Sequence, residues 1–350
     1  MQKNRDSSFD AFRGFAIIAV VATHVTWSGY PWRYSPTGSW NFFFLVAYRQ
    51  LLNFAVPAFL FISGYWLSKK PIKSLKDYKT FLTKRLPRVL IPYLFWSFVL
   101  LGYAAIKTHD FNVHKIIFKL LTGGASAGYF FIVMIAQFYL ITPLLQYINR
   151  KRYGLILVLI INTVSLSALY LSRLFNIIGH IPASLPFYSW IIFYEIGLLI
   201  GNRDNKILAP KNTRLFILPA ILVALLISEL EGMILLLKYE NLSFAVTPVK
   251  YSSFLYSVCI ILGFLFVRER FRHWPKLLVT LGNYSFGIYL IHLPVLDGVV
   301  SVVKKSNIIY SFQPLYQFIV ALIAISICFV LISTTRKLLP KSFCSKVLGF

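Results

Sequence analysis

The sequence of 350 residues is poor in charge and in cysteine. Asp, Glu, Lys and Arg make up 13% of it, whereas a soluble globular domain carries about 25% charged residues. Only three cysteines occur, and their spacing fits neither a CxxC metal site nor a disulfide framework. There is also no Walker A, HExxH or GxGxxG motif. These absences give no support for a nucleotide-binding P-loop, a dinucleotide fold or a metal centre.

The residues that are abundant are apolar. They form 58% of the chain, and the mean hydropathy is +0.70. A water-soluble fold of this size could not bury so much apolar surface, so the lipid bilayer is the predicted solvent for much of it. We predict an all-α, polytopic membrane protein of about ten transmembrane helices, with residues 1–350 forming one domain and no separate soluble domain. The predicted spans are 9–28, 42–67, 89–106, 127–148, 154–172, 186–201, 214–230, 249–267, 280–297 and 314–335.

The basic residues predict the orientation of these spans. The net charge is +25, with 36 Lys and Arg against 11 Asp and Glu. The bases stand in short clusters between apolar runs, which is typical of cytoplasmic loops and gives no support for nucleic-acid binding. With both termini inside, 25 of the 36 bases fall on the cytoplasmic side and 10 on the other, and Arg13 lies within the first span. The sequence therefore predicts an N-in, C-in, multi-pass protein of the cytoplasmic (inner) membrane.

Ionisable residues within the first span are the first candidates for function. Such a residue costs about 2.5–3.5 kcal/mol on insertion, so it usually has a role. Asp10 and Arg13 are three residues apart and can pair on one helix face. Arg13 and His24 are eleven residues apart, which is about three turns and roughly 16 Å along the same face. The alternative is that Arg13 extends to the inner interface and His24 bonds a neighbouring helix.

Two arginines stand where the most basic segment meets the third span. The sequence RLPRVLIPY places Arg85 and Arg88 at the predicted start of that helix. Guanidinium groups at a helix N-terminus suit phosphate binding, although contact with anionic lipid would use the same residues. Pro87 disfavours helix at Leu86, which would keep the two arginines off one helical face.

Two more ionisable residues lie in later spans. His292, in LGNYSFGIYLIHLP, is expected at a depth comparable to His24, so the two could share a polar site or each bridge helices. Glu195, in IIFYEIGLLIG, is expected in the inner half, where it is either a functional residue or the structural partner of a basic residue such as Arg13.

Five segments in this order resemble the acyltransferase-3 family of bacterial membrane proteins. FDAFRGFAIIAVVATH carries the family's Arg, ten residues and His as Arg13 and His24, and Arg85 and Arg88 match its basic-x-x-Arg motif. VPAFLFISGYWL, with Ser63, resembles the family's second-helix segment, and QFYLITPLL and LGNYSFGIYLIHLP resemble later landmarks. One departure is that the fourth span begins AGYFFIV, where the family often has His and Trp.

This resemblance implies an O-acetyltransferase type of enzyme that uses no metal. The donor would be acyl-CoA, usually acetyl-CoA, with its phosphates held by Arg85 and Arg88 and its pantetheine arm directed into the bundle. His24 would be the general base, or a nucleophile that forms an acyl-imidazole. Arg13 would neutralise phosphate or stabilise the negative charge that develops on the thioester oxygen. Asp10, Ser63, Glu195 and His292 would support the site.

The implied acceptor is a hydroxyl of a cell-surface polysaccharide or a lipid-linked carbohydrate. The chain would complete the transfer itself, with a separate extracytoplasmic partner, or as a homo-oligomer. One rival is a transporter or flippase with the polar stripe as its path, although no internal repeat is evident. The other rival is a structural or sensory membrane protein.

Overall fold

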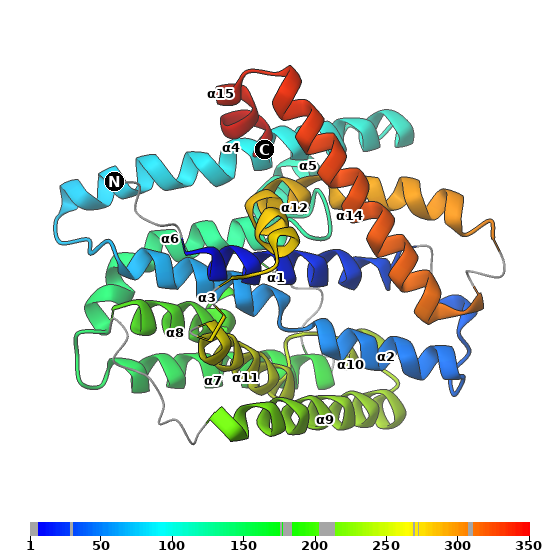
Figure 1. Cartoon of the computed structure of the whole chain (residues 1–350), viewed down its shortest axis with the longest axis horizontal. Coiled ribbons are helices and arrows are strands. Elements are labelled where there is room, and N and C mark those ends of the chain that lie inside the picture. Colours follow the sequence, from blue (N-terminus) through cyan, green and yellow to red (C-terminus); the bar gives the residue numbers. More distant parts are fainter. Residues whose placement is uncertain are drawn as a thin grey trace.

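The computed structural model describes residues 6–28, 31–175, 177, 184–202, 214–268, 270–271, 273–306 and 311–350, and all their regular structure is helical. Nine helical segments in this part of the chain are long and apolar enough to cross a membrane. They are α1 (Ser7–Val25), α2 with α3 (Trp40–Leu52 and Ala55–Ser68), α4 (Leu75–Thr108), α6 (Phe130–Ile148), α7 (Gly154–Leu174), α9 (Arg214–Tyr239), α11 (Tyr251–Arg268), α12 (Lys276–Val303) and α14 (Gln313–Leu338). The predicted sixth span is the short helix α8 (Ile191–Asn202), preceded by the 3₁₀ turn η2 (Phe187–Trp190). The all-α, polytopic prediction is confirmed (Figure 1).

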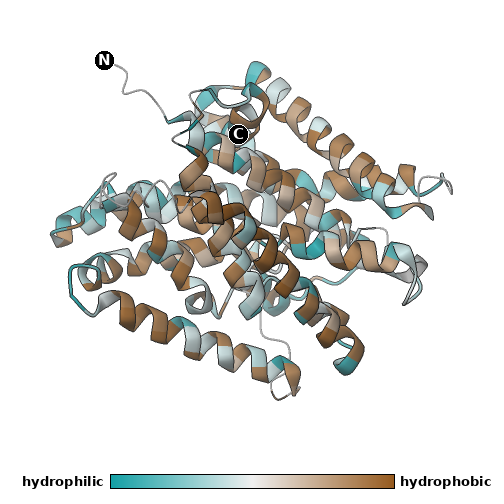
Figure 2. Ribbon diagram, turned by 60° about the horizontal axis from the view of Figure 1, so that its bottom comes forward, coloured by the Kyte–Doolittle hydropathy of each residue, from teal (hydrophilic) through white to brown (hydrophobic). Residues whose placement is uncertain are grey.

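The outer helices carry the apolar surface that the composition requires. On α9, Leu215 is 77% exposed and Phe216 is 70% exposed. The exterior of the long helices is largely hydrophobic (Figure 2). Because such a surface is unfavourable in water, these helices face lipid.

The second predicted span is broken near its middle. Helix α2 ends at Leu52 and α3 begins at Ala55. Pro57 has no backbone N–H, so it cannot bond the carbonyl of Asn53 across the break. The side chain of Asn53 instead donates to the carbonyl oxygen of Thr247 at 3.3 Å and to Ser253 Oγ at 3.2 Å. The break therefore joins α2 to the segment before α11, through Thr247, and to α11 itself, through Ser253.

The third span begins much earlier than predicted. Helix α4 starts at Leu75 rather than at residue 89, so most of the basic segment is helix and not loop. A capping box nucleates it: Asp77 N donates to Ser74 Oγ at 3.1 Å, and Ser74 N donates to Asp77 Oδ2 at 3.0 Å. The expectation that Pro87 breaks the helix is wrong, because α4 continues through it. The residues on either side of Pro87 therefore belong to one helix.

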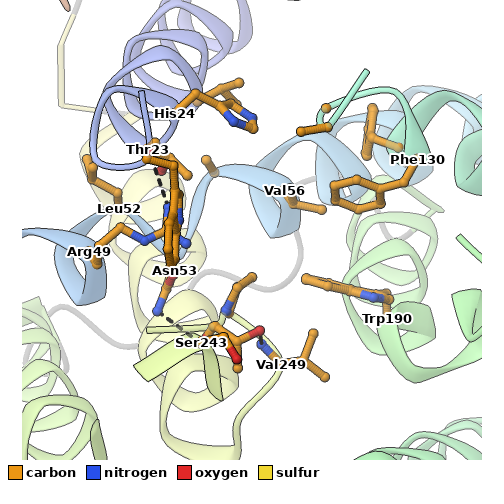
Figure 3. Close-up of a pocket in the computed structure, with 18 of the residues that line it drawn as sticks. Thr23, His24, Arg49, Leu52, Asn53, Val56, Phe130, Trp190, Ser243 and Val249 are labelled. Atoms are coloured by element: carbon orange, nitrogen blue, oxygen red, sulfur yellow. Dashed lines mark hydrogen bonds between the residues drawn. The ribbon is translucent and has the colours of Figure 1, made fainter. Parts of the chain in front are cut away.

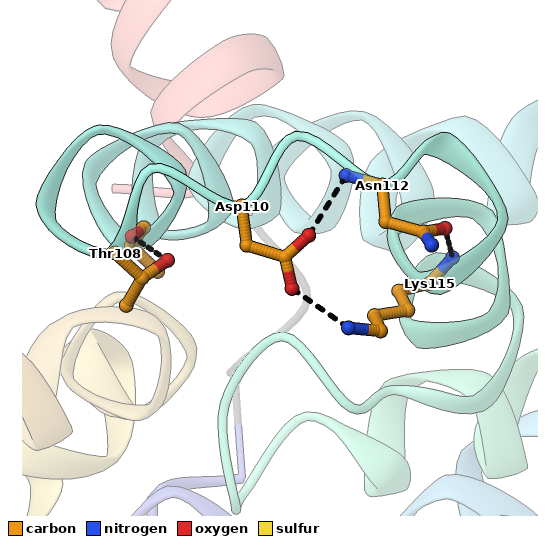
Figure 4. A network of polar contacts seen from close by, with 5 residues as sticks. Thr108, Asp110, Asn112 and Lys115 are labelled. Carbon is orange, nitrogen blue, oxygen red and sulfur yellow. Dashed lines mark hydrogen bonds and ion pairs between the residues drawn. The ribbon is translucent and has the colours of Figure 1, made fainter.

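A polar turn ends α4 and starts α5 (Val113–Thr122), a helix that was not predicted (Figure 4). His109 adopts a left-handed conformation with φ of 53°. Asp110 then accepts from Lys115 Nζ at 2.7 Å, and Asn112 caps α5 by accepting from Lys115 N at 3.0 Å. The bonded ammonium of Lys115 holds the pKa of Asp110 below its ordinary value.

Two helix pairs approach so closely that only glycine fits between them. A Cβ atom on Gly14 of α1 would lie 2.0 Å from the carbonyl oxygen of Leu278 of α12, and one on Gly282 would lie 1.7 Å from that of Asp10. Helices α3 and α8 are joined in the same way, since a Cβ on Gly64 would lie 2.1 Å from the Tyr194 oxygen. Small residues of this kind are how membrane helices pack backbone to backbone.

The C-terminal residues pack back onto the bundle. After α14 come the short α15 (Lys341–Phe343) and one π-helical turn, η4 (Cys344–Leu348). Trp96 Nε1 of α4 donates to the carbonyl oxygen of Leu348 at 3.0 Å, and the ring of Phe350 lies 5.9 Å from that of Trp96. The tail is thus part of the packing around α4.

Candidate functional site

A cavity of about 760 Å³ lies at the C-terminal end of α1. Figure 3 shows His24 and Arg49 on one side of it and Phe130 and Trp190 on the other. Its lining residues come from α1, α2, α3, α6, α7, α12, η2, the segment 241–249 and the turns next to α1, α6 and η2. Aromatic side chains and three basic ones line it, and none of the described lining residues is acidic. A largely apolar cavity with a few polar groups is typical of a small-molecule site.

Three polar groups meet at Gly128 on the cavity wall: His24 and Tyr289 line the cavity, and His292 is buried next to them. A Cβ atom on Gly128 would lie 3.6 Å from His24 Nε2, 3.5 Å from His292 Cε1 and 3.6 Å from Tyr289 Oη. The rings of His24 and His292 have centroids 5.0 Å apart. His24 is partly exposed to the cavity, whereas His292 is fully buried. The two histidines therefore share a site, as one reading of the sequence predicted.

The hydrogen bonds of His292 fix which of its ring nitrogens is free. Nδ1 lies 2.7 Å from the Tyr289 carbonyl oxygen, and a carbonyl can only accept, so Nδ1 carries the proton. Nε2 of a neutral ring is then an acceptor, and it has no partner among the described residues. The Tyr289 hydroxyl is also buried without a partner. Because buried polar groups are normally bonded, two unused groups beside His24 indicate a place for a ligand or water.

Two arginines also line the cavity. Arg49 donates from Nη1 to the Thr23 oxygen at 3.2 Å and from Nη2 to the Val246 oxygen at 3.3 Å. Arg173 donates to Thr247 Oγ1 at 3.1 Å. The segment that contains Val246 and Thr247 is held in place by two more hydrogen bonds. The side chains of Gln50 and Lys250 both donate to the carbonyl oxygen of Ala245. The broken α2–α3 helix thus builds one wall of the cavity.

A second basic group gathers at the other end of α1. Arg13 donates to Asp10 at 3.4 Å, so the predicted pair on one face is confirmed. The positive charges of Arg13, Arg85 and Arg88 all act on the hydroxyl of Tyr139 on α6. Arg85 and Arg88 are three residues apart within α4, so they share a side of that helix. Arg13, Arg85 and Arg88 therefore form a basic cluster, and Arg13 lies roughly 16 Å from His24 along α1.

The remaining predicted residues lie elsewhere. Ser63 is half-buried on α3 and is not among the residues that line the cavity. Glu195 is fully buried on α8, but it does not bond Arg13: neither carboxylate oxygen has a hydrogen-bond partner in the described part of the chain. Its polar neighbour is Asn149. The predicted pairing of Glu195 with Arg13 is therefore wrong, because α8 packs on α3 and not on α1.

Several residues of the cavity were missed by the sequence analysis. Arg49 is an ionisable residue inside a predicted span, so the rule that selected Arg13 would have selected it too. Tyr289 and Arg173 gave no comparable signal. The segment 124–128 reads GASAG and has GxSxG spacing. That pattern needs a strand before its serine, whereas here a helix precedes it, and Ser126 is not among the lining residues. No cluster of three metal-ligating side chains lies within the described ranges.

Comparisons with known proteins give one family model and relatives that carry two kinds of name. A family model described as an acyltransferase domain matches residues 6–334. A Bacillus subtilis (strain 168) protein named as a membrane-bound acyltransferase, YfiQ, is 27% identical over 262 residues, which cover 70% of this chain and 69% of that one. Proteins of several Staphylococcus aureus strains, named as poly-beta-1,6-N-acetyl-D-glucosamine export proteins, are 24% identical over 267 residues, or 71% of each chain. No solved structure gives a significant match.

Proposed function

The chain belongs to the acyltransferase-3 family of membrane proteins, and from that premise we propose that it transfers an acetyl or similar short acyl group from acyl-CoA to a carbohydrate hydroxyl. The observation that supports this most directly is the convergence of His24 Nε2, His292 and Tyr289 Oη at Gly128 on the cavity wall. An acyl transfer to a hydroxyl needs a base for the hydroxyl proton and donors for the developing oxyanion.

In the proposed reaction His24 is the base, because its ring faces the cavity. It removes the proton as the acceptor oxygen attacks the thioester carbon, and the proton passes to the departing thiolate. Tyr289 Oη–H is positioned to donate to the oxyanion. Attack by His24 itself on the thioester, through an acyl-imidazole, is the alternative order of the same steps.

The donor is proposed to bind through its phosphates at the basic cluster of Arg13, Arg85 and Arg88. Arg13 and His24 are eleven residues apart on α1, which is roughly 16 Å. An extended pantetheine arm of roughly 15–20 Å would span most of that distance, judged against the helical rise. Acetyl-CoA is the proposed donor because the family resemblance implies it.

The same scheme proposes an orientation. CoA thioesters are made in the cytoplasm, so the basic cluster would face the cytoplasm and the cavity the outside. This agrees with the predicted N-in, C-in topology in the inner membrane, which rests on the distribution of Lys and Arg. Six of the residues counted there lie outside the described residues: Lys3, Arg5, Arg203, Lys206, Lys211 and Arg272. We propose that residues 1–350 act as one domain.

A second candidate function is export of a glycan without chemistry. It is favoured by the names of the Staphylococcus aureus relatives. The two candidates differ in a simple way, because an exporter needs no thioester. Consumption of acetyl-CoA by the purified protein supports transfer, and acceptor movement in proteoliposomes without any thioester loss supports export.

Replacement of His24 tests the proposal. His24→Ala should lower acetyl-CoA-dependent acylation by about 10²–10⁴-fold, the usual effect of losing a general base. The assay follows thioester consumption and acceptor acylation by purified, monodisperse protein in detergent. His292→Ala is the control and should impair activity less, because His292 lies behind His24. Near wild-type activity of His24→Ala would exclude the mechanism even though the family assignment stands.

A further inference from the structure

We propose that the cavity binds an anionic group of the acceptor, a phosphate or a carboxylate next to the sugar hydroxyl, through Arg49 and Arg173. This inference rests on the proposed function and names the acceptor class that the proposed function leaves open. The evidence for it is the positive charge of Arg49 and Arg173 and the hydrogen bonds that hold these two side chains in the cavity wall.

Arg49 is a buried cation with an unused donor. Only 6% of the residue is exposed, and its Nε is buried without a hydrogen-bond partner among the described residues. Its two terminal nitrogens are held by the carbonyl oxygens of Thr23 and Val246. The guanidinium is therefore fixed in place next to His24, while its charge is compensated only by dipoles.

Arg173 brings a second positive charge to the same place. It donates to Thr247 Oγ1, next in sequence to the Val246 that holds Arg49, and it lies over the ring of Phe244 at 6.0 Å. Adjacent residues, Val246 and Thr247, therefore hold the two guanidinium groups, and both groups line the same cavity. A cavity that brings in two positive charges and no described acidic side chain favours an anionic ligand.

No carboxylate of the described lining meets these charges. Neither arginine forms an ion pair with a described residue, and the cavity lining has no Asp or Glu. The nearby acids Glu229 and Glu231 act on the buried Lys250 and do not line the cavity. Burying an unpaired charge is costly, so natural sites pair it with a ligand charge or a metal. Arginine in particular forks the oxygens of phosphate and carboxylate groups.

The acceptor is the more consistent source of that anion, although the phosphates of CoA have the same chemistry. In the proposed layout the CoA phosphates sit at the Arg13 end, roughly 16 Å from His24 along α1. The cavity also has Trp27 and Trp190 in its lining, flat apolar surfaces suited to a sugar ring, and its volume of about 760 Å³ admits a sugar phosphate. An anion held at Arg49 would place a neighbouring hydroxyl beside His24.

The test compares anionic and neutral sugars on the whole purified protein in detergent. Glucose, glucose 1-phosphate, glucuronate and CoA are titrated while tryptophan fluorescence is recorded, since Trp27 and Trp190 report on the cavity. We expect the two anionic sugars to bind at least tenfold tighter than glucose, the usual size of a hydrogen bond to a charged group. Arg173→Gln should remove that preference without changing the affinity for CoA.

Lys238→Gln is the matched control, because Lys238 is an exposed base on α9 that does not line the cavity. It should keep the preference. Arg49→Lys retains the positive charge and should keep part of the preference for anionic sugars. It is used in place of a truncation of Arg49, which could prevent folding. Equal binding of glucose and the anionic sugars overturns the proposal. So does a loss of CoA affinity in Arg173→Gln that matches the loss for the sugars, because the anion would then belong to the donor. If the protein prefers anionic sugars but cleaves no thioester, the proposed acyl transfer is refuted while the proposed anion site at Arg49 and Arg173 stands.

Discussion

The contact between α1 and α12 makes Gly282→Ala an informative perturbation. A Cβ atom at Gly282 would lie 1.7 Å from the backbone oxygen of Asp10, whereas ordinary contacts begin at about 3.4 Å. Backbone cannot swing aside as a flexible side chain does, so the two helices must separate by roughly 1.5 Å at this point. His24 and His292 each lie ten residues beyond the paired glycines Gly14 and Gly282, about 15 Å along their helices.

The separation of α1 and α12 at Gly282 should also displace His24 and His292 relative to each other. A misplacement of about 1 Å can cost about 10²-fold in rate, so we expect the turnover of Gly282→Ala to fall by about that factor. Overpacking should also cost roughly 1–3 kcal/mol of stability. The assay is acetyl-CoA consumption by purified protein, together with the melting temperature in the same detergent.

Gly298→Ala is the matched control on the same helix. A Cβ atom at Gly298 meets nothing within 4 Å, and alanine favours helix over glycine. This variant should keep full activity and melt at the same or a higher temperature. If Gly282→Ala behaves like Gly298→Ala, then the close crossing does not set the geometry of the two histidines and the reasoning fails.

Three further predictions concern the rest of the molecule. Arg85→Ala and Arg88→Ala should raise the KM for acetyl-CoA more than they lower kcat, since contacts remote from the reacting carbon act as uniform binding; lost turnover at unchanged donor affinity would contradict this. Cysteine introduced at Lys305 should react with an impermeant reagent on intact cells and cysteine at Lys346 only after permeabilisation, and the reverse would invert the topology. Lys115→Gln should raise the pKa of Asp110 towards its ordinary value. The melting-temperature gap to wild type should therefore be present at neutral pH and close as the pH falls through the lowered pKa of Asp110, with activity unchanged throughout.

The parts of the molecule that follow from local patterns could be read from the sequence. Hydropathy located the spans, and helical periodicity aligned Asp10, Arg13 and His24, because both depend on residues within a few turns. The early start of α4 was also readable, since Ser74 and Asp77 have the spacing of a capping box. The sequence analysis gave more weight to the helix-disfavouring effect of Pro87 than to the capping box, whereas the helix begins at the capping box and continues through Pro87.

The cavity could not be read in this way because its partners are distant in sequence. Arg49 bonds Val246, 197 residues away, and the Tyr129 hydroxyl donates to the carbonyl oxygen of Leu290, 161 residues away. Nor does any local rule indicate that Gly128 lies between two histidines. Such contacts depend on how whole helices pack. Patterns in a single sequence do not show which residues of one helix lie opposite which residues of another.

The docked tail has a consequence for how the protein is made. The indole of Trp96 and its acceptor, the carbonyl oxygen of Leu348, are 252 residues apart. At a synthesis rate of about 5–20 residues per second, α4 waits on the order of 10–50 s in the membrane before that acceptor is made. Over that interval Trp96 must find lipid headgroups, water or an insertion chaperone as its temporary partner. This contact therefore forms only after α14 has been synthesised, so α4 enters the membrane before the acceptor of its indole exists.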